Sequence, residues 1–258
     1  MVKVDQQFAL EAYSFPSAVN GYCRAVRDIG LWKSEKRIAA KYLPVRGRIL
    51  DLGCGAGRTT FGLYREGYRN LVGADLCPDM IRHARAHSGR RKAAIRFRVA
   101  DACRLPFQAR SFEGCLFSFN GLMTIPRLSR RIAALREIRR VLKPGGHCVF
   151  TTHERLGGPR ERAFWRGEAA RWRKGTQDPR LHEIGDQILE ELGRPTFVHV
   201  PDRREMLKCL RNADLEWVED APSNLAGESG AVREFVGSEL RFWVARRPSR
   251  REPPVRGV

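Results

Sequence analysis

The most informative stretch of the sequence is Ile49-Leu50-Asp51-Leu52-Gly53-Cys54-Gly55-Ala56-Gly57. An apolar run of strand length leads into three glycines at alternate positions and then into a segment with helical spacing. Because glycine lacks Cβ, such a loop permits a tight strand-to-helix turn and lets a ligand lie against backbone N–H groups at a helix start. A dinucleotide fingerprint would place Gly or Ala where this chain has Arg58, so the sequence disfavours a nicotinamide cofactor.

Two further acidic residues follow the next two expected strands. Asp75 ends the run Val72-Gly73-Ala74, and its carboxylate can accept hydrogen bonds from both ribose hydroxyls of an adenosine ligand. Asp101 ends the run Val99-Ala100, where a carboxylate can accept the adenine amino group. Three strand-end carboxylates are therefore expected at one crevice, although Asp51 and Asp75 would also serve as helix caps in an ordinary doubly wound protein.

Short apolar runs alternate with longer amphipathic segments, which predicts βα units around a parallel sheet. We expect strands at residues 48–52, 70–74, 95–100, 113–119, 146–152, 215–219 and 240–245. We expect helices at residues 59–66, 78–87, 128–142 and 202–212. Residues 154–180 break this rhythm with charge, Gly and Trp, and they are interpreted as a partly helical insertion.

The sequence resembles the class I S-adenosylmethionine-dependent methyltransferase family over residues 48–152. Four motifs occur in that family's order: Asp51-Leu52-Gly53-Cys54-Gly55-Ala56-Gly57, Gly73-Ala74-Asp75-Leu76, Asp101-Ala102 with Leu105-Pro106-Phe107, and Leu142-Lys143-Pro144-Gly145-Gly146. The resemblance implies an α/β, doubly wound, mostly parallel seven-stranded sheet whose last strand is antiparallel. It also implies S-adenosylmethionine as cofactor, S-adenosylhomocysteine as product, and methyl transfer by direct displacement.

The resemblance also implies roles for individual residues. It places Asp51, Gly53, Gly55 and Gly57 near the methionine moiety, Asp75 with Leu76 at the ribose, and Asp101 with Ala102 at the adenine. Phe119 and Asn120 come at the end of the strand expected at 113–119. They are further candidates for cofactor binding, because ligands of such sheets bind at the carboxyl ends of the strands.

The acceptor side of the site is predicted from position and composition alone. His153 follows the strand expected at 146–152 and is the candidate catalytic residue; a solvated loop histidine is the alternative. Tyr13 and Tyr22 are substrate-site candidates on an N-terminal helical lid, and core packing explains them equally. Trp165 and Trp172 are substrate-site candidates in a cap, the alternative being that they anchor an insertion to the core.

These assignments give a domain organisation of five segments. We expect a helical lid at residues 1–45, the cofactor-binding core at 46–152, a substrate cap at 153–200, completion of the sheet at 201–246, and a disordered tail at 247–258.

A formal charge of +19 over 258 residues suits an anionic partner such as RNA, but the basic residues are mostly arginine and are spread along the chain. Neither an Asp/Asn-Pro-Pro-aromatic motif nor a Pro-Cys dipeptide is present, which disfavours base-amino and cytosine C5 methylation of nucleic acids. The favoured partner is a small organic acceptor. RNA methylation and a non-catalytic cofactor-binding module are the alternatives.

The remaining features set limits on location and cofactors. Seven scattered cysteines without a C-x-x-C pair suit a reducing cytoplasm, and no long apolar run predicts a membrane span. His83 and His87 lie four residues apart without a third ligand, and His182-Glu183-Ile184-Gly185-Asp186 lacks the second histidine of a metalloprotease motif, so no metal is expected. The protein is expected to be a monomer or a homodimer.

Overall fold

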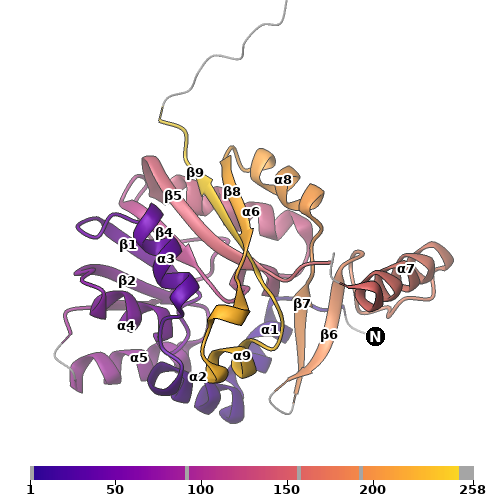
Figure 1. Cartoon of the computed structure of the whole chain (residues 1–258), viewed down its shortest axis with the longest axis horizontal. Coiled ribbons are helices and arrows are strands. Elements are labelled where there is room, and N and C mark those ends of the chain that lie inside the picture. Colours follow the sequence, from indigo (N-terminus) through magenta and orange to yellow (C-terminus); the bar gives the residue numbers. More distant parts are fainter. Residues whose placement is uncertain (1–2, 91–92, 156–157, 192–193, 250–258) are drawn as a thin grey trace, which may run out of the picture.

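A seven-stranded sheet with helices on both faces forms the body of the protein (Figure 1). The computed structural model describes residues 3–90, 93–155, 158–191 and 194–249, so most of the tail predicted at 247–258 lies outside the described residues. The strand order is β3-β2-β1-β4-β5-β9-β8. The strands β1 to β5 run parallel, and β9 runs antiparallel to both of its neighbours, β5 and β8. This is the sheet that the sequence predicts.

The elements follow one another in a regular βα succession. The strands of the sheet are β1 (Arg48–Leu52), β2 (Asn70–Asp75), β3 (Arg96–Val99), β4 (Phe112–Phe117), β5 (Leu142–Thr152), β8 (Glu216–Pro222) and β9 (Arg241–Arg246). The helices are α1 (Gln6–Ser14), α2 (Pro16–Asp28), α3 (Lys33–Tyr42), α4 (Arg58–Arg65), α5 (Pro78–Arg90), α6 (Leu128–Val141), α7 (Pro159–Lys174), α8 (Arg203–Asn212) and α9 (Gly230–Val236), with short 3-10 turns η1 (Gly121–Thr124) and η2 (Leu225–Gly227).

The alternation of side chains along the strands divides the core into two layers. Leu50 and Leu52 of β1 face the cluster beneath α6 and α8, which includes Leu135 and Leu210. Ile49 faces the opposite cluster, to which α3 and α4 contribute. Both faces of the parallel strands are therefore buried, which explains why β1 and β2 are almost continuously apolar.

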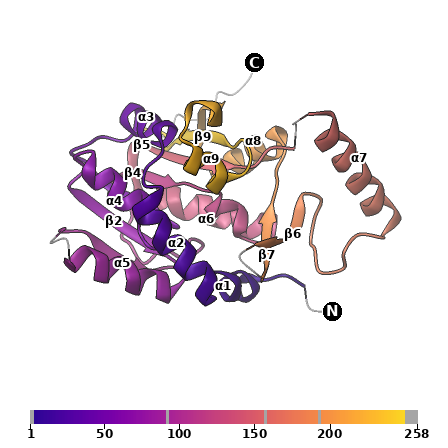
Figure 2. The same ribbon diagram turned by 60° about the horizontal axis from the view of Figure 1, so that its bottom comes forward.

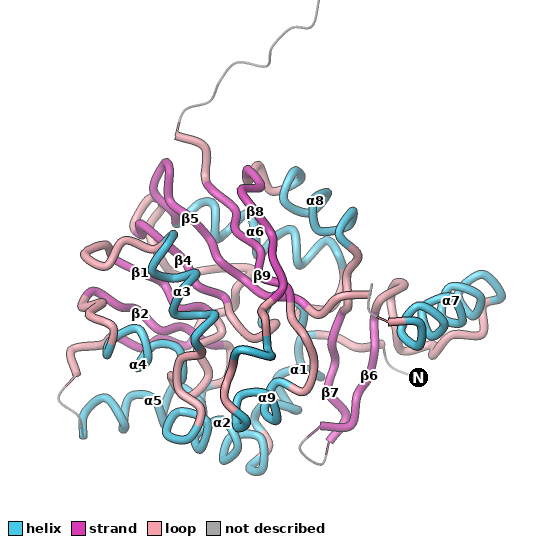
Figure 3. The backbone as a smooth tube through the Cα atoms, viewed as in Figure 1, coloured by secondary structure: helices cyan, strands magenta, loops and turns pink. Residues whose placement is uncertain are grey.

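The segment between β5 and α8 differs most from expectation. An antiparallel hairpin of β6 (Asp186–Glu191) and β7 (Arg194–His199), which the sequence analysis did not predict, forms a second small sheet (Figure 3). Helix α7 has no fully buried residue and stands away from the body beyond this hairpin (Figures 1 and 2). The strand expected at 146–152 also begins earlier, at Leu142, because this residue already pairs with Phe112 of β4 directly after α6.

The N-terminal helices α1 and α2 lie across the carboxyl-end edge of the sheet (Figure 2). Asp5 precedes helix α1, and its side chain accepts a hydrogen bond from Phe8 N and so caps the first turn. Both helices pack against α5, and α1 also packs against β7. In the part of the chain that the structure describes, every helix is too short or too polar to cross a bilayer.

Candidate functional site

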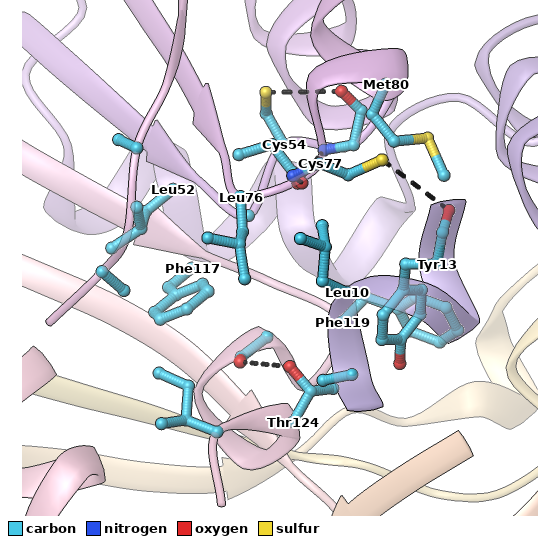
Figure 4. A pocket seen from close by; sticks show the side chains of 18 of the residues that line it. Leu10, Tyr13, Leu52, Cys54, Leu76, Cys77, Met80, Phe117, Phe119 and Thr124 are labelled. Atoms are coloured by element: carbon cyan, nitrogen blue, oxygen red, sulfur yellow. Dashed lines mark hydrogen bonds between the residues drawn. The ribbon is translucent and has the colours of Figure 1, made fainter. Parts of the chain in front are cut away.

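A cleft of about 150 Å³ opens at the carboxyl ends of β1, β2 and β4. The strand order reverses between β1 and β4, and ligands of doubly wound sheets bind at such a switch point. The glycine loop after β1 forms one side, and α1 covers the cleft with Leu10 and Tyr13 (Figure 4). Leu10 faces Leu76, which follows β2, across the cleft (Figure 4).

Two glycines of the loop are required by its geometry. Gly53 has φ 64°, and a Cβ there would lie 2.7 Å from Cε2 of Phe117, so any larger residue would both strain the backbone and displace a core ring. Gly55 has φ 53°, and its Cβ would project into the cleft, with Cδ1 of Tyr22 at 4.0 Å as its nearest neighbour. The bare backbone at Gly55 therefore leaves room for a ligand to approach closely.

Asp75 lines the cleft and is linked to the glycine loop. Its Oδ2 accepts a hydrogen bond from Gly55 N at 2.7 Å, and its Oδ1 accepts one from Cys77 N at 2.9 Å. Burial raises the pKa of this carboxyl, and the hydrogen bonds from Cys77, Gly55 and Leu76 partly offset the rise. A carboxylate oxygen has more than one lone pair, so both oxygens retain the capacity to accept a further hydrogen bond from a diol.

Asp101 also lines the cleft, together with Ala102. Its Oδ1 accepts a hydrogen bond from Cys103 N at 2.8 Å, and its Oδ2 lies 3.2 Å from Nη2 of Arg130. Arg130 of α6 also lines the cleft. Arg130 could not be predicted from the sequence, because nothing in the spacing of α6 distinguishes it from neighbouring arginines.

Asp51 lies beneath the glycine loop and is not among the residues that line the cleft. Its Oδ2 accepts hydrogen bonds from Oγ1 of Thr59 at 2.7 Å and from Oγ1 of Thr60 at 2.5 Å. Burial raises the pKa of Asp51 to about 6, against the lowering effect of both threonines. The residue thus joins the end of β1 to the first turn of α4. Gly57, which begins that turn, also lies outside the lining.

A buried ion pair supports the cleft from behind. Arg58 donates to Glu35 through Nη1 at 2.7 Å and Nη2 at 2.6 Å, and the two side chains are 8% and 0% exposed. Glu35 also accepts from Trp32 N at 3.0 Å and from Oγ of Ser118 at 2.5 Å. One carboxylate therefore joins α3, the start of α4 directly after the glycine loop, and the residue that follows β4. The departure from the dinucleotide fingerprint at Arg58 was the only sign of this pair in the sequence.

A second hollow of about 600 Å³, here called the outer chamber, adjoins the cleft. The two share Tyr13, Tyr22, Phe119 and Thr124 as lining residues, so both predicted lid tyrosines lie where the hollows meet. The other walls of the outer chamber come from α2, β7 and α9, together with the loops after β4 and β5.

His153 and Asn120 line the outer chamber, and they lie 2.8 Å apart between Nε2 and Nδ2. Asn120, which was predicted to contact the cofactor, therefore lines the outer chamber and not the cleft, whereas Phe119 lines both hollows. Trp165 and Trp172 line neither hollow. They belong to α7, and Arg155 lies over the ring of Trp165 at 5.3 Å, so the structure does not bring these two residues to the rest of the site.

Strand β7 lies within the predicted cap at 153–200, and it lines the outer chamber with Thr196, Phe197 and Val198. At the end of β7, His199 lies 2.7 Å from Asp186 Oδ1 and 2.7 Å from Glu205 Oε1. Burial alone would raise the pKa values of Asp186 and Glu205, but their hydrogen bonds to His199 bring both below the ordinary range. This buried network fixes the hairpin to α8.

Residues 49–146 match the family model of the methyltransferase domain. The chain is 34% identical to a demethylmenaquinone methyltransferase from Deinococcus radiodurans over 130 residues, and 29% identical to a malonyl-[acyl-carrier protein] O-methyltransferase from Erwinia pyrifoliae over 180 residues. These matches cover 48% and 69% of this chain, and the chain spans 52% and 65% of the length of the two relatives.

The fold has close counterparts among solved structures. A SAM-dependent methyltransferase from Methanosarcina mazei superposes with a TM-score of 0.65 at 19% identity, covering 83% of this chain and 98% of that one. Such a low identity supports the fold alone.

Proposed function

We propose that this chain, a member of the class I S-adenosylmethionine-dependent methyltransferase family, transfers a methyl group from S-adenosylmethionine to a small organic acceptor. The observation that carries the proposal is the meeting of the Gly53–Gly55 loop, Asp75 and Asp101 around one cleft that continues into a second chamber. When bound, the cofactor supplies an electrophilic methyl group on a sulfonium.

The residues around the cleft fit this cofactor. The Asp75 carboxylate suits the two ribose hydroxyls, and Asp101 with Ala102 suits the adenine edge. Gly53 and Gly55 leave bare backbone beside the remaining, amino-acid part of the ligand, because a Cβ at Gly55 would enter the cleft. Asp51 would act indirectly, through the threonines that begin α4.

The acceptor is proposed to bind in the outer chamber, between the lid helices and β7. Tyr13 and Tyr22 sit at its junction with the cleft, where an acceptor would have to approach the methyl group. Methyl transfer to an O–H, N–H or C–H group releases one proton, so a chamber open to solvent suits the reaction. The cytoplasmic location and the monomeric or dimeric state stay predictions.

The direct test is calorimetric titration of the folded protein with S-adenosylmethionine and with S-adenosylhomocysteine, using NAD and ATP as controls. Micromolar binding of the first pair and no comparable binding of the controls would support the proposal. Absence of binding by both methionine-derived ligands would overturn it.

RNA is the second candidate acceptor, and the surface of α7 favours it. This helix is exposed and carries Arg160, Arg162, Arg166, Arg171, Arg173 and Lys174 against two glutamates. A phosphate-binding surface of this kind makes affinity fall steeply with salt. RNA binding that weakens by orders of magnitude between 50 and 200 mM salt would support this candidate, and salt-independent or undetectable binding would remove it.

A further inference from the structure

Two polar side chains that line the outer chamber, Asn120 and His153, form a hydrogen-bonded chain with Ser238. Asn120 Nδ2 lies 2.8 Å from Nε2 of His153, and Nδ1 of His153 lies 3.2 Å from Oγ of Ser238. An amide nitrogen can only donate, so Nε2 of His153 accepts and the ring proton is on Nδ1, facing Ser238. His153 is therefore neutral in this arrangement. Burial, which lowers the pKa of His153, favours the same state.

The other end of the Asn120 amide has no matching group. The Asn120 side chain is buried, with 5% of the residue exposed, and its Oδ1 has no hydrogen-bond partner among the described residues. A buried carbonyl oxygen without a donor is costly, and Asn120 is one of the residues that line the chamber, so a ligand in the chamber that donates to this oxygen would supply the partner it lacks.

The backbone holds this amide in place. Asn120 has φ 63° and the preceding Phe119 has φ 55°, two consecutive non-glycine residues in the left-handed region. Asn120 N donates to Oγ1 of Thr151 at 2.9 Å, which fixes the turn against β5. The strained turn therefore holds Asn120 in the lining of the chamber.

The walls around the amide are aromatic. Phe119 and Phe235 stack with centroids 4.9 Å apart, and Tyr22 meets each ring edge-on at 6.5 and 6.4 Å. Phe197 of β7 lines another wall. Such surfaces favour a flat aromatic ligand, which can pack against ring edges and faces.

The charges at the chamber do not favour an anion, although the chain as a whole is strongly basic. The charged residues that line it are Arg24, Asp28 and Glu234, all of them exposed, and their formal charges sum to −1. A carboxylate or phosphate on the acceptor would lose its hydration without gaining a buried cation.

We propose that the acceptor is a neutral aromatic compound bearing a hydroxyl group, that Asn120 Oδ1 accepts the hydrogen bond of this hydroxyl, and that His153 positions the Asn120 amide. The inference rests on the proposed methyl transfer and names its acceptor class. A hydroxyl that donates its hydrogen keeps both oxygen lone pairs, so its oxygen stays available as a nucleophile. The new O–CH3 bond would form as the sulfonium S–CH3 bond breaks, S-adenosylhomocysteine would be the leaving group, and the hydroxyl proton would pass to solvent water in the chamber. His153 then acts as a positioning residue, in place of the catalytic role predicted from the sequence.

The test compares four probes that share one ring system: 1-naphthol, 1-fluoronaphthalene, 1-naphthoate and 1-naphthylmethylammonium. Binding is measured by intrinsic fluorescence on the protein saturated with S-adenosylhomocysteine, and again on the ligand-free protein. We expect 1-naphthol to bind about tenfold more tightly than 1-fluoronaphthalene, the effect of one buried hydrogen bond, and more tightly than either charged probe.

Variants assign this difference to the two residues. Asn120→Gly tolerates the left-handed backbone and should bring the naphthol preference close to one, whereas Asn120→Asp should keep it. His153→Leu should reduce the preference, and His153→Gln should restore it, because a glutamine oxygen can accept from Nδ2 of Asn120. In the wild type, ¹⁵N NMR should show the neutral Nδ1–H tautomer of His153.

The outcomes distinguish a failure of the proposed methyl transfer from a failure of the proposed acceptor class or residue roles. Failure of S-adenosylhomocysteine to bind the folded wild type overturns the proposed methyl transfer. With that binding intact and unchanged in the variants, a naphthol preference that survives Asn120→Gly overturns the role of Asn120. Tighter binding of 1-naphthoate or 1-naphthylmethylammonium than of 1-naphthol overturns the acceptor class. Equal loss of preference in His153→Gln and His153→Leu overturns the positioning role.

Discussion

Replacement of Glu35 by Gln tests whether the buried pair with Arg58 holds the cofactor cleft together. The substitution keeps the shape of the side chain but removes its charge, so the guanidinium of Arg58 is left buried without a counter-charge. The Glu35 carboxylate accepts four hydrogen bonds with two oxygens, and the glutamine would have only one acceptor oxygen for them. Breaking one side of a buried pair costs about 3–5 kcal/mol, and we expect Glu35→Gln to lower the free energy of unfolding by that amount.

The chain offers a matched control on its surface. Lys36 and Glu66 also form an ion pair, at 2.7 Å, but their side chains are 58% and 34% exposed. Glu66→Gln should therefore cost about 0–1 kcal/mol. Urea unfolding followed by circular dichroism measures both variants, with the midpoint and slope determined separately. A loss below about 1 kcal/mol in Glu35→Gln, equal to that of the control, would refute the reasoning.

Two further predictions concern the glycine loop and the acid beneath it. Gly53→Ala should abolish cofactor binding and lower the free energy of unfolding by about 1–3 kcal/mol, because its Cβ would meet Phe117. The control is Gly175→Ala: this glycine has φ 69° and open space around it, so its substitution should lower the free energy of unfolding by only about 1 kcal/mol. Equal effects of the two substitutions would contradict this prediction. Because burial raises the pKa of Asp51 to about 6, the folded protein binds that proton more tightly than the unfolded chain. Wild-type stability relative to Asp51→Asn should therefore fall by about 2 kcal/mol between pH 4 and 7, and a difference independent of pH in urea unfolding would count against the buried carboxyl.

The sheet could be predicted because its determinants are local. The apolar runs of β1 and β2, the glycine loop and the helical spacing before Leu142 each specify their own element, and the motif order then implies the seven-stranded topology. The hairpin of β6 and β7 could not be predicted in the same way. It is held by the contacts of His199 with Asp186 and Glu205, which lie 13 and 6 residues away in the sequence.

The cofactor side of the site could be predicted as well as the sheet, but the acceptor side could not. Asp75 and Asp101 lie at the cleft because strand ends of a parallel sheet meet at one edge, which the sequence pattern already contains. The partnership of Glu35 with Arg58, and that of Asn120 with His153, joins residues from different elements. No spacing rule links such pairs, and Trp165 on α7 shows that composition alone does not place an aromatic residue at a pocket.

The central claim is that Asp75 and the glycine loop bind S-adenosylmethionine, and calorimetry on Asp75→Ala tests it most directly. Two charge-assisted hydrogen bonds to the ribose are worth about 3–6 kcal/mol together, so affinity for S-adenosylhomocysteine should fall at least a hundredfold. Asp79→Ala, which removes an exposed carboxylate on α5 that pairs with Arg82, should leave the affinity unchanged. Wild-type binding that persists in folded Asp75→Ala, or a folded wild type that binds neither ligand, would contradict the account.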